Sequence, residues 1–243
     1  GLSSNSILDL GGREMISLPD LYATDFTWCA KGRMQERPQA ICRIIFELDF
    51  NNSPLAAENF FHLCKGDKGK GKSSNVPMTY KGSKIHRFVP GFIMQGGDYV
   101  FGNGTGGESI FGKKFKDEPK GLKLKHDGKG ILSMGNSGKN SNSSQFFITL
   151  DTKGAPQCDK KHVVFGKIKH GIEVLDVIAQ EHSARAAGAG GSGGDGGGGE
   201  GEGGSEESPY VSLVITECGE WDETMPVQGY WAPDDSFTTN KVI

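Results

Sequence analysis

This sequence of 243 residues lacks cysteines at the close spacing typical of metal sites and disulfide-rich domains. Its five cysteines, Cys29, Cys42, Cys64, Cys158 and Cys218, are odd in number and include no C-x-x-C pair. This pattern argues against a disulfide framework and against a zinc ribbon. The six histidines show no metal-ligand spacing either. We therefore expect a protein of a reducing compartment that carries no metal.

Long apolar runs are also missing. Apolar residues make up only 35% of the chain, and no run approaches the roughly 20 residues that a membrane-spanning helix needs. The opening "GLSSNSILDLGGREM" has no basic start followed by an apolar stretch, so we expect no signal peptide. The sequence thus predicts a cytoplasmic protein, with the nucleus as the alternative, and no membrane contact.

Charge and glycine are unevenly distributed. Residues 38–182 hold 21 Lys and Arg against 14 Asp and Glu, a balance of +7, whereas residues 183–243 hold 2 against 11, a balance of −9. Of the 38 glycines, 12 fall within residues 188–204. A basic body could bind RNA or an acidic partner, but no base-stacking motif is present, so we do not expect nucleic acid. The acidic, glycine-rich segment is interpreted as a flexible, solubilising insert.

Two glycine motifs suggest nucleotide binding, but their surroundings do not. "GDKGKGKS" (66–73) fits the P-loop pattern, which requires a strand before it and a helix after it. Residues 53–64 instead predict a helix before it, with Ser53 as N-cap, Pro54 in the first turn, and an apolar face of Leu55, Ala56, Phe60, Leu63 and Cys64. "GNGTGG" (102–107) fits a dinucleotide motif, but Gly112 and Pro119 interrupt the required helix. Both motifs are interpreted as loops.

The remaining pattern predicts a mainly β protein. Residues 41–50 alternate, which indicates a strand with one buried face formed by Cys42, Ile44, Phe46, Leu48 and Phe50. Short apolar segments separated by glycine turns follow. Residues 171–180, with Ile172, Leu175 and Ile178, suit a second helix, and residues 210–218 suit a last strand. Seven or eight short strands with two helices indicate a closed antiparallel barrel. The last strand must rejoin this barrel, because alone it could bury nothing.

Three regions follow from this pattern. Residues 1–37 form an irregular extension, residues 38–220 form the domain with a glycine-rich acidic insert at 183–208, and residues 221–243 form a tail.

Three long motifs resemble the cyclophilin family: residues 86–112 ("HRFVPGFIMQGGDYVFGNGTGGESIFG"), 130–149 and 161–168. The resemblance covers about residues 38–182 and 210–220. It implies a closed eight-stranded antiparallel barrel capped by two α-helices, and peptidyl-prolyl cis–trans isomerase activity on X–Pro peptides and proteins. It also implies a monomer without a cofactor.

The resemblance also implies a set of site residues. Arg87 matches the arginine that donates to the proline nitrogen. The residues that match the proline pocket and the grip on the substrate backbone are Phe92, Ile93, Gln95, Gly135, Asn136, Ser137, Gln145, Phe147, Gln157 and His162.

Some of these residues depart from the family pattern. Ile93 stands where methionine is usual, and Gly135 and Ser137 stand where alanines are usual. Gln157 stands where the tryptophan that binds cyclosporin is usual. We therefore expect cyclosporin to bind weakly.

About eight inserted residues, "KSSNVPMT" (72–79), resemble the loop of the divergent-loop subclass. That resemblance implies that Glu108 binds the loop through backbone N–H groups. It also implies that Cys64 and Cys218 lie close together as a possible redox pair. Whether they form a disulfide stays open.

Two functions from different classes stay open at this point. The first is an active isomerase, which the presence of Arg87 favours. The second is a proline-peptide binding module of a larger complex, with partner contacts in the extension, the insert and the tail.

Overall fold

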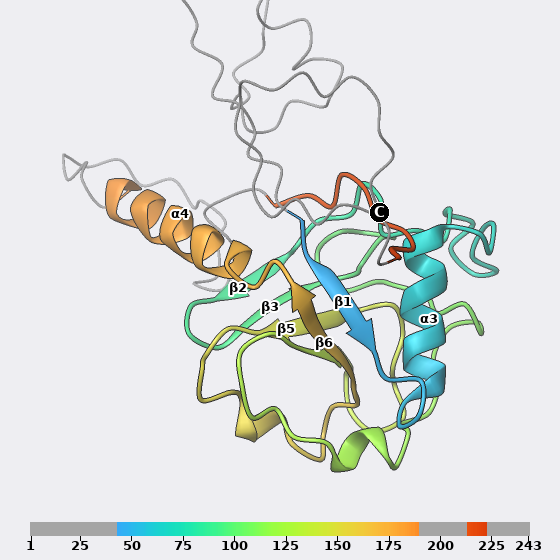
Figure 1. Ribbon diagram of the computed structural model, residues 1–243. Coiled ribbons are helices and arrows are strands. Elements are labelled where there is room, and N and C mark those ends of the chain that lie inside the picture. Colours follow the sequence, from blue (N-terminus) through green and yellow to red (C-terminus); the bar gives the residue numbers. More distant parts are fainter. Residues whose placement is uncertain (1–42, 190–212, 223–243) are drawn as a thin grey trace, which may run out of the picture. The chain divides into compact units, whose positions relative to one another are not determined.

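The computed structural model describes residues 43–189 and 213–222 (Figure 1). All of them belong to a compact unit that begins at Ile41. The predictions for the extension 1–37, for the glycine-rich tract from residue 190 onward and for the tail beyond residue 222 lie outside the described residues.

Within the described residues, six short strands form one antiparallel sheet in the order β1-β6-β4-β5-β3-β2. Their bounds are β1 (Ile45–Leu48), β2 (Arg87–Val89), β3 (Ile93–Gly96), β4 (Ile131–Met134), β5 (Phe146–Thr149) and β6 (Val164–His170). The helices are α3 (Pro54–Lys65) and α4 (Val174–Ala189), with short 3₁₀ turns η2 (Gly121–Lys123) and η3 (Pro156–Cys158). The expectation of a mainly β protein with two helices is confirmed. The sheet of the described residues is not closed and has six strands rather than eight.

The two faces of the sheet carry different apolar clusters. Side chains alternate between faces along a strand, and Phe88, Met94, Phe146, Ile148 and Leu132 all pack into the main core. Their neighbours Ile93 and Phe147 belong to a second cluster, together with Ala155, Cys158 and the partly buried Phe92. We call this second set the outer cluster. The alternation therefore separates the residues that hold the fold from a set on the opposite face.

Helix α3 closes one side of the main core (Figure 1). Its buried Phe60 makes ring contacts with Phe46, Tyr80, Phe146 and Phe165 at centroid distances of 5.2–5.6 Å. Aromatic pairs in this geometry contribute about 0.5–1.5 kcal/mol each beyond the area they bury. Phe60 thus joins α3 to strands β1, β5 and β6 at once.

The start of α3 differs from the expected N-cap. Ser53 precedes the helix, but its hydroxyl donates to the Val164 carbonyl at 2.6 Å and makes no cap bond. The first N–H groups of the helix, those of Leu55 and Ala56, donate instead to the buried Glu118 carboxylate at 2.8 and 2.9 Å. A carboxylate at this position also interacts favourably with the helix dipole. The cap therefore comes from a residue distant in the sequence.

Three predicted core positions are wrong, namely Phe50, Leu55 and Ile172, which are 51%, 39% and 43% exposed. Phe50 is exposed because β1 ends at Leu48 and Phe50 lies in the turn that follows; Ile44, Phe46 and Leu48 pack against the main core as expected. Leu55 is in the first turn of α3, and Ile172 precedes α4, so neither lies on a buried helix face. Among the described residues, no helix has the length and apolar character to cross a membrane.

Residues 213–215 return to the unit next to the chain just before β2. The Ile85 N–H donates to the Leu213 carbonyl at 3.0 Å, and the Ile215 N–H donates to the Ser83 carbonyl at 2.9 Å. Leu213 and Ile215 also pack against the main core. The prediction that the segment after the glycine tract rejoins the same core is confirmed for these residues.

Candidate functional site

One row of paired residues crosses the sheet and carries much of the candidate site. Arg87 pairs with Gln95, Gln95 pairs with Phe147, and Phe147 pairs with Ser133. Residues directly opposite each other in antiparallel strands point to the same face. Strand register therefore brings together a cation, an amide, an aromatic ring and a hydroxyl from four strands.

A chain of amide contacts leads from Arg87 across this face. Arg87 Nη1 lies 3.5 Å from Gln95 Oε1, and Gln95 Nε2 donates to Gln145 Oε1 at 2.9 Å. Gln145 Nε2 in turn donates to the carbonyls of Gly104 and Gly106, both at 2.8 Å. Each amide is held at both ends, so its orientation is determined. The structure thus brings Arg87, Gln95 and Gln145 together on one face of the sheet.

The loop that receives Gln145 is organised by the buried carboxylate of Asp98. Its oxygens accept the N–H groups of Phe101, Gly104 and Gly106 at 2.9–3.0 Å. Burial would raise the pKa of Asp98, but these N–H donors outweigh burial and hold the pKa below its usual value. The "GNGTGG" motif thus wraps around a protein carboxylate, which explains why it is a loop and not a dinucleotide site.

The outer cluster lies beside this chain of amides. Phe147 is 2% exposed, and its ring meets the His162 ring edge-on at 5.2 Å. His162 Nδ1 lies 3.0 Å from the Met134 carbonyl, so this nitrogen carries the proton. Burial lowers the pKa of His162, which favours the neutral ring. The outer cluster is therefore a set of largely buried apolar side chains, bordered by an imidazole whose neutral form is favoured.

Two members of the outer cluster were missed by the sequence interpretation. Ala155 and Cys158 come from the segment around η3 and pack with Ile93 and Phe147. Burial raises the pKa of the Cys158 thiol, and the nearby charges of Lys161 and Arg87 act in the opposite direction. Arg87 shares the face of the outer cluster, because it pairs with Gln95 and Gln95 pairs with Phe147. No local pattern marks these residues, because strand pairing brings β3 and β5 to them.

The remaining predicted site residues lie around this centre. Asn136 Nδ2 donates to the Lys161 carbonyl at 2.9 Å, which ties it to the residue before His162. The Gly135 N–H donates to the Gln145 carbonyl at 2.8 Å. Ser137 is exposed and accepts a hydrogen bond from Lys114 Nζ at 3.1 Å. Gln157 is exposed in η3, next to Cys158.

The "GDKGKGKS" segment has no P-loop geometry. Helix α3 ends at Lys65, and Gly66 caps it in the left-handed conformation with φ 68°. No helix follows in the segment; Lys70 instead pairs with Pro77 and the Met78 N–H donates to the Gly69 carbonyl at 2.8 Å. The prediction of a surface loop is confirmed.

Glu108 binds this loop as expected. It is 3% exposed, and its carboxylate accepts the N–H groups of Ser73 and Ser74 at 3.1–3.3 Å and the Ser74 hydroxyl at 3.0 Å. Burial would raise the pKa of Glu108, but these donors lower it below its usual value. These hydrogen bonds to the buried Glu108 hold the inserted loop in place.

The Cys64 and Cys218 side chains are hydrogen-bonded to each other, and neither forms a disulfide. The Cys64 hydrogen bond lowers the pKa of Cys218 to about 7 despite its burial, assisted by Thr79 and the Lys81 N–H. The pKa of Cys64 is raised well above its usual value, first by this hydrogen bond and then by burial. Cys218 is therefore the more acidic thiol of the pair.

Fold and site together define a β-sheet protein with an apolar site that a guanidinium and oriented amides border. Residues 36–196, more than half of the chain, match the family model of the cyclophilin type peptidyl-prolyl cis-trans isomerase/CLD. The chain belongs to this family.

The family match is supported by one curated relative. The peptidyl-prolyl cis-trans isomerase cyp11 of Rhizopus delemar is 50% identical over 141 residues, which cover 58% of this chain and 40% of the relative. The matched part is thus less than half of the relative's own length.

Proposed function

We propose that this protein is a peptidyl-prolyl cis–trans isomerase that accelerates rotation about X–Pro bonds in peptides and proteins. The observation that carries the proposal is the position of Arg87 beside the outer cluster, within a chain of oriented amides. Family membership and the name of the relative support the same activity.

The chemical problem is a rotation barrier rather than a bond to be broken. Amide resonance gives a barrier of about 18–20 kcal/mol, so uncatalysed exchange at X–Pro takes about 10–100 s. Catalysis requires that the enzyme bind the twisted amide more tightly than either planar isomer. On twisting, the proline nitrogen regains a lone pair, which a fixed donor stabilises.

The residues supply these two requirements separately. The outer cluster, with Phe92, Ile93 and Phe147, offers an apolar seat for the proline ring, and His162 borders it. The Arg87 guanidinium donates to the proline nitrogen, while Gln95 keeps that guanidinium oriented. Asn136 and Gly135 hold the backbone before the proline, whose carbonyl must remain free to swing.

A protease-coupled assay on a short X–Pro peptide tests the proposal directly. An active isomerase speeds the slow phase of cleavage in proportion to its concentration. The competing function, a proline-peptide binding module, predicts a measurable Kd by calorimetry with no change in the slow phase. The second result would overturn the proposed activity and leave the binding site intact.

We also propose that Cys64 and Cys218 form a redox pair that controls the inserted loop. Support comes from their mutual hydrogen bond and from the pKa of about 7 at Cys218, which gives a substantial thiolate fraction near neutral pH. Oxidation would join the two sulfurs, and the two protons and two electrons removed from the thiols would reduce one hydrogen peroxide to two water molecules. The loop held by Glu108 follows Cys64 in the sequence, and Thr79 at its end hydrogen-bonds Cys218.

The finer architecture is proposed as the closed eight-stranded barrel of the family. Residues 213–215 support one further strand beside residues 83–85. The other edge of the described sheet is β1. Amide hydrogen exchange tests this arrangement. The N–H groups of β1 that point away from β6, and the N–H groups of residues 213–218, are expected to exchange slowly. Fast exchange along β1 would contradict closure.

A further inference from the structure

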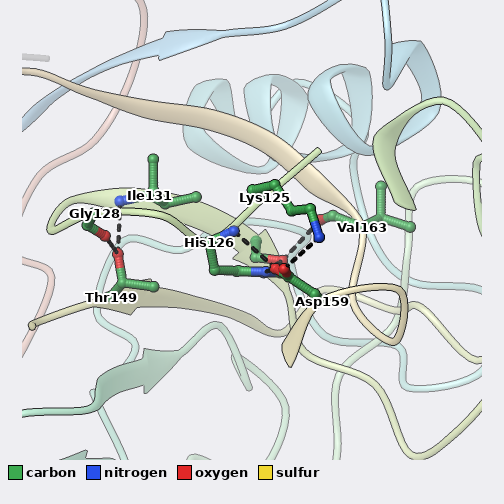
Figure 2. A network of polar contacts seen from close by, with 8 residues as sticks. Lys125, His126, Gly128, Ile131, Thr149, Asp159 and Val163 are labelled. Carbon is green, nitrogen blue, oxygen red and sulfur yellow. Dashed lines mark hydrogen bonds and ion pairs between the residues drawn. The ribbon is translucent and has the colours of Figure 1, made fainter. Parts of the chain in front are cut away.

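His126 lies between Asp159 and Ser133 in a network of polar contacts, of which Figure 2 labels His126 and Asp159. His126 is 1% exposed, its Nδ1 lies 2.9 Å from Asp159 Oδ1, and its Nε2 lies 2.9 Å from Ser133 Oγ. The His126 N–H also donates to the same Asp159 oxygen at 2.9 Å. Nothing in the sequence interpretation assigned these three residues a role.

The arrangement has the connectivity of a hydrolytic triad but not its access. Ser133 is fully buried, and its Oγ lies 3.0 Å from the Val163 carbonyl. A nucleophilic hydroxyl must reach a substrate carbonyl, which a buried one cannot do. The network therefore acts on its neighbours in the fold.

The proton positions in the network follow from its partners. Burial would raise the pKa of Asp159, but the His126 N–H and ring and the Lys125 ammonium hold that pKa far below its usual value. An ionised carboxylate only accepts hydrogen bonds, so Nδ1 of His126 carries the proton. Burial lowers the pKa of His126, with Asp159 opposing, so the ring is neutral at pH 7. Its Nε2 then accepts the proton of the Ser133 hydroxyl.

The Val163 carbonyl does not lose a partner in this state, because it accepts the Met134 N–H at 2.9 Å. If His126 becomes protonated, Nε2 becomes a donor to Ser133 Oγ. The hydroxyl proton then turns to the Val163 carbonyl, already 3.0 Å away. Both charge states of the ring are therefore satisfied without displacement of a heavy atom.

The network supports the outer cluster from three directions. The His126 ring stacks on the Phe147 ring with centroids 5.7 Å apart and an interplanar angle of 16°. The His126 carbonyl accepts the Ala155 N–H at 2.7 Å. Ser133 is the register partner of Phe147 on β4. His126 thus contacts the back of the ring whose edge meets His162.

We propose that His126, fixed between Asp159 and Ser133, is a positioning residue that sets the Phe147 ring of the proline site. This inference rests on the proposed isomerase function for its effect on turnover. Asp159 and Asp127 act on the His126 ring, and the ring acts on His162. Lys125 acts on Asp159, to which it is paired. The ring is held in the Nδ1–H tautomer, and its loss of orientation would loosen the seat of the proline ring.

The test compares Ser133→Ala with a matched variant, Thr149→Val. Thr149 is also a fully buried hydroxyl that donates to one carbonyl, that of Gly128 at 2.6 Å, and accepts one N–H, that of Ile131 at 2.9 Å (Figure 2). It lies on β5 like Phe147 but does not bond His126. Both variants lose a buried hydroxyl oxygen that lies near two polar groups, so both lose stability. Only Ser133→Ala removes a contact of His126.

Four measurements distinguish a specific effect on the Phe147 ring from a general loss of stability. They are kcat/KM, the Kd for an X–Pro peptide, the NMR shift of the Ala155 methyl group as a reporter of the Phe147 ring current, and the ring ¹⁵N shifts of His126. We expect Ser133→Ala to lower kcat/KM at least fivefold, raise Kd and move the Ala155 methyl signal. Thr149→Val should stay within twofold in kcat/KM and leave that signal in place.

Equal losses in the two variants, unchanged turnover in Ser133→Ala, or a wild-type ring protonated on Nε2 at pH 7 would each overturn the proposal. If His126→Gln folds, it should reproduce the effect of Ser133→Ala; if it does not fold, Ser133→Ala decides alone. A wild-type protein without turnover would overturn the isomerase proposal instead. The Ala155 signal and the peptide Kd would then still decide the positioning role.

Discussion

The Cys64 thiol is hydrogen-bonded to Cys218, joining the end of α3 to the C-terminal segment. Their pKa values are displaced in opposite directions, so Cys218 is the better nucleophile. We expect mild peroxide to join the two residues and to lower isomerase activity reversibly. Peptide mapping by mass spectrometry with activity assays before and after reductant measures both effects.

The third described cysteine is an internal reference for this experiment. Cys158 is buried and its pKa is raised, so it should remain a free thiol. Cys64→Ser and Cys218→Ser should each remove the reversible inhibition. Full activity in a fully bridged protein would contradict the regulatory role, and two free thiols after peroxide would contradict the pair itself.

Arg87→Ala should lower kcat/KM at least tenfold with the fold retained. The variant removes the donor to the twisted proline nitrogen, and tenfold corresponds to about 1.4 kcal/mol of lost transition-state stabilisation. Lys84→Ala is the matched control, because it removes an exposed cation three positions away. The two variants are compared in the protease-coupled assay, with circular dichroism to verify folding. Equal turnover in both would refute the role of Arg87.

Gln157→Trp should strengthen cyclosporin binding. Gln157 is exposed in η3 next to Cys158 of the outer cluster, so an indole can be added without repacking of the core. A buried aromatic anchor often contributes about 2 kcal/mol or more, roughly 30-fold in Kd by calorimetry. Gln157→Leu adds apolar area without the N–H donor and should give a smaller gain. Tight wild-type binding would show that Gln157 does not occupy the tryptophan position.

Stability should decline as pH falls from 7.5 to 5.5. Burial lowers the pKa of His86, His126 and His162, whereas an unfolded histidine titrates near 6.5. The unfolded chain therefore binds more protons in this range, so the contribution present above about pH 6.5 is lost as pH falls through the lower folded values. Each ~1 kcal/mol lost lowers Tm by about 2–4 °C in a domain of this size.

Calorimetry at constant ionic strength measures this decline. Asp98 and Asp159, whose pKa values are lowered, stay ionised throughout the range and contribute no slope there. Combined His86→Gln and His162→Gln substitutions should flatten the dependence. A Tm independent of pH in the wild type would rule out the role of the histidines.

Gly154→Ala should destabilise the protein far more than Gly82→Ala. Both glycines have positive φ, 78° and 83°, so alanine adds a similar left-handed penalty of about 1–2 kcal/mol at each. At Gly82 the new Cβ meets nothing, but at Gly154 it would overlap the His126 carbonyl oxygen. Urea unfolding should show a loss of ~3 kcal/mol or more at Gly154. A similar loss of unfolding free energy in the two variants would mean that the backbone around His126 can move to make room for the new Cβ.

The sequence by itself determined the class of fold and the family. Alternation and glycine turns indicated a mainly β protein, the spacing of Phe60 and Leu63 indicated the buried face of α3, and a helix before "GDKGKGKS" excluded a P-loop. The motifs around Arg87, Gln95 and Phe147 indicated the family, which the family match confirmed. These signals are local, because they depend on side-chain periodicity and on contiguous motifs.

Only the tertiary structure decided which distant residues meet. Strand register places Ser133 opposite Phe147, and the turn at η3 brings Ala155 and Cys158 to the outer cluster. Phe50 is exposed against the expected alternation because β1 ends at Leu48. Such pairings are set by hydrogen bonds between strands far apart in the chain, and a shift of one residue reverses the face of every following side chain. No pattern within a single segment contains that information.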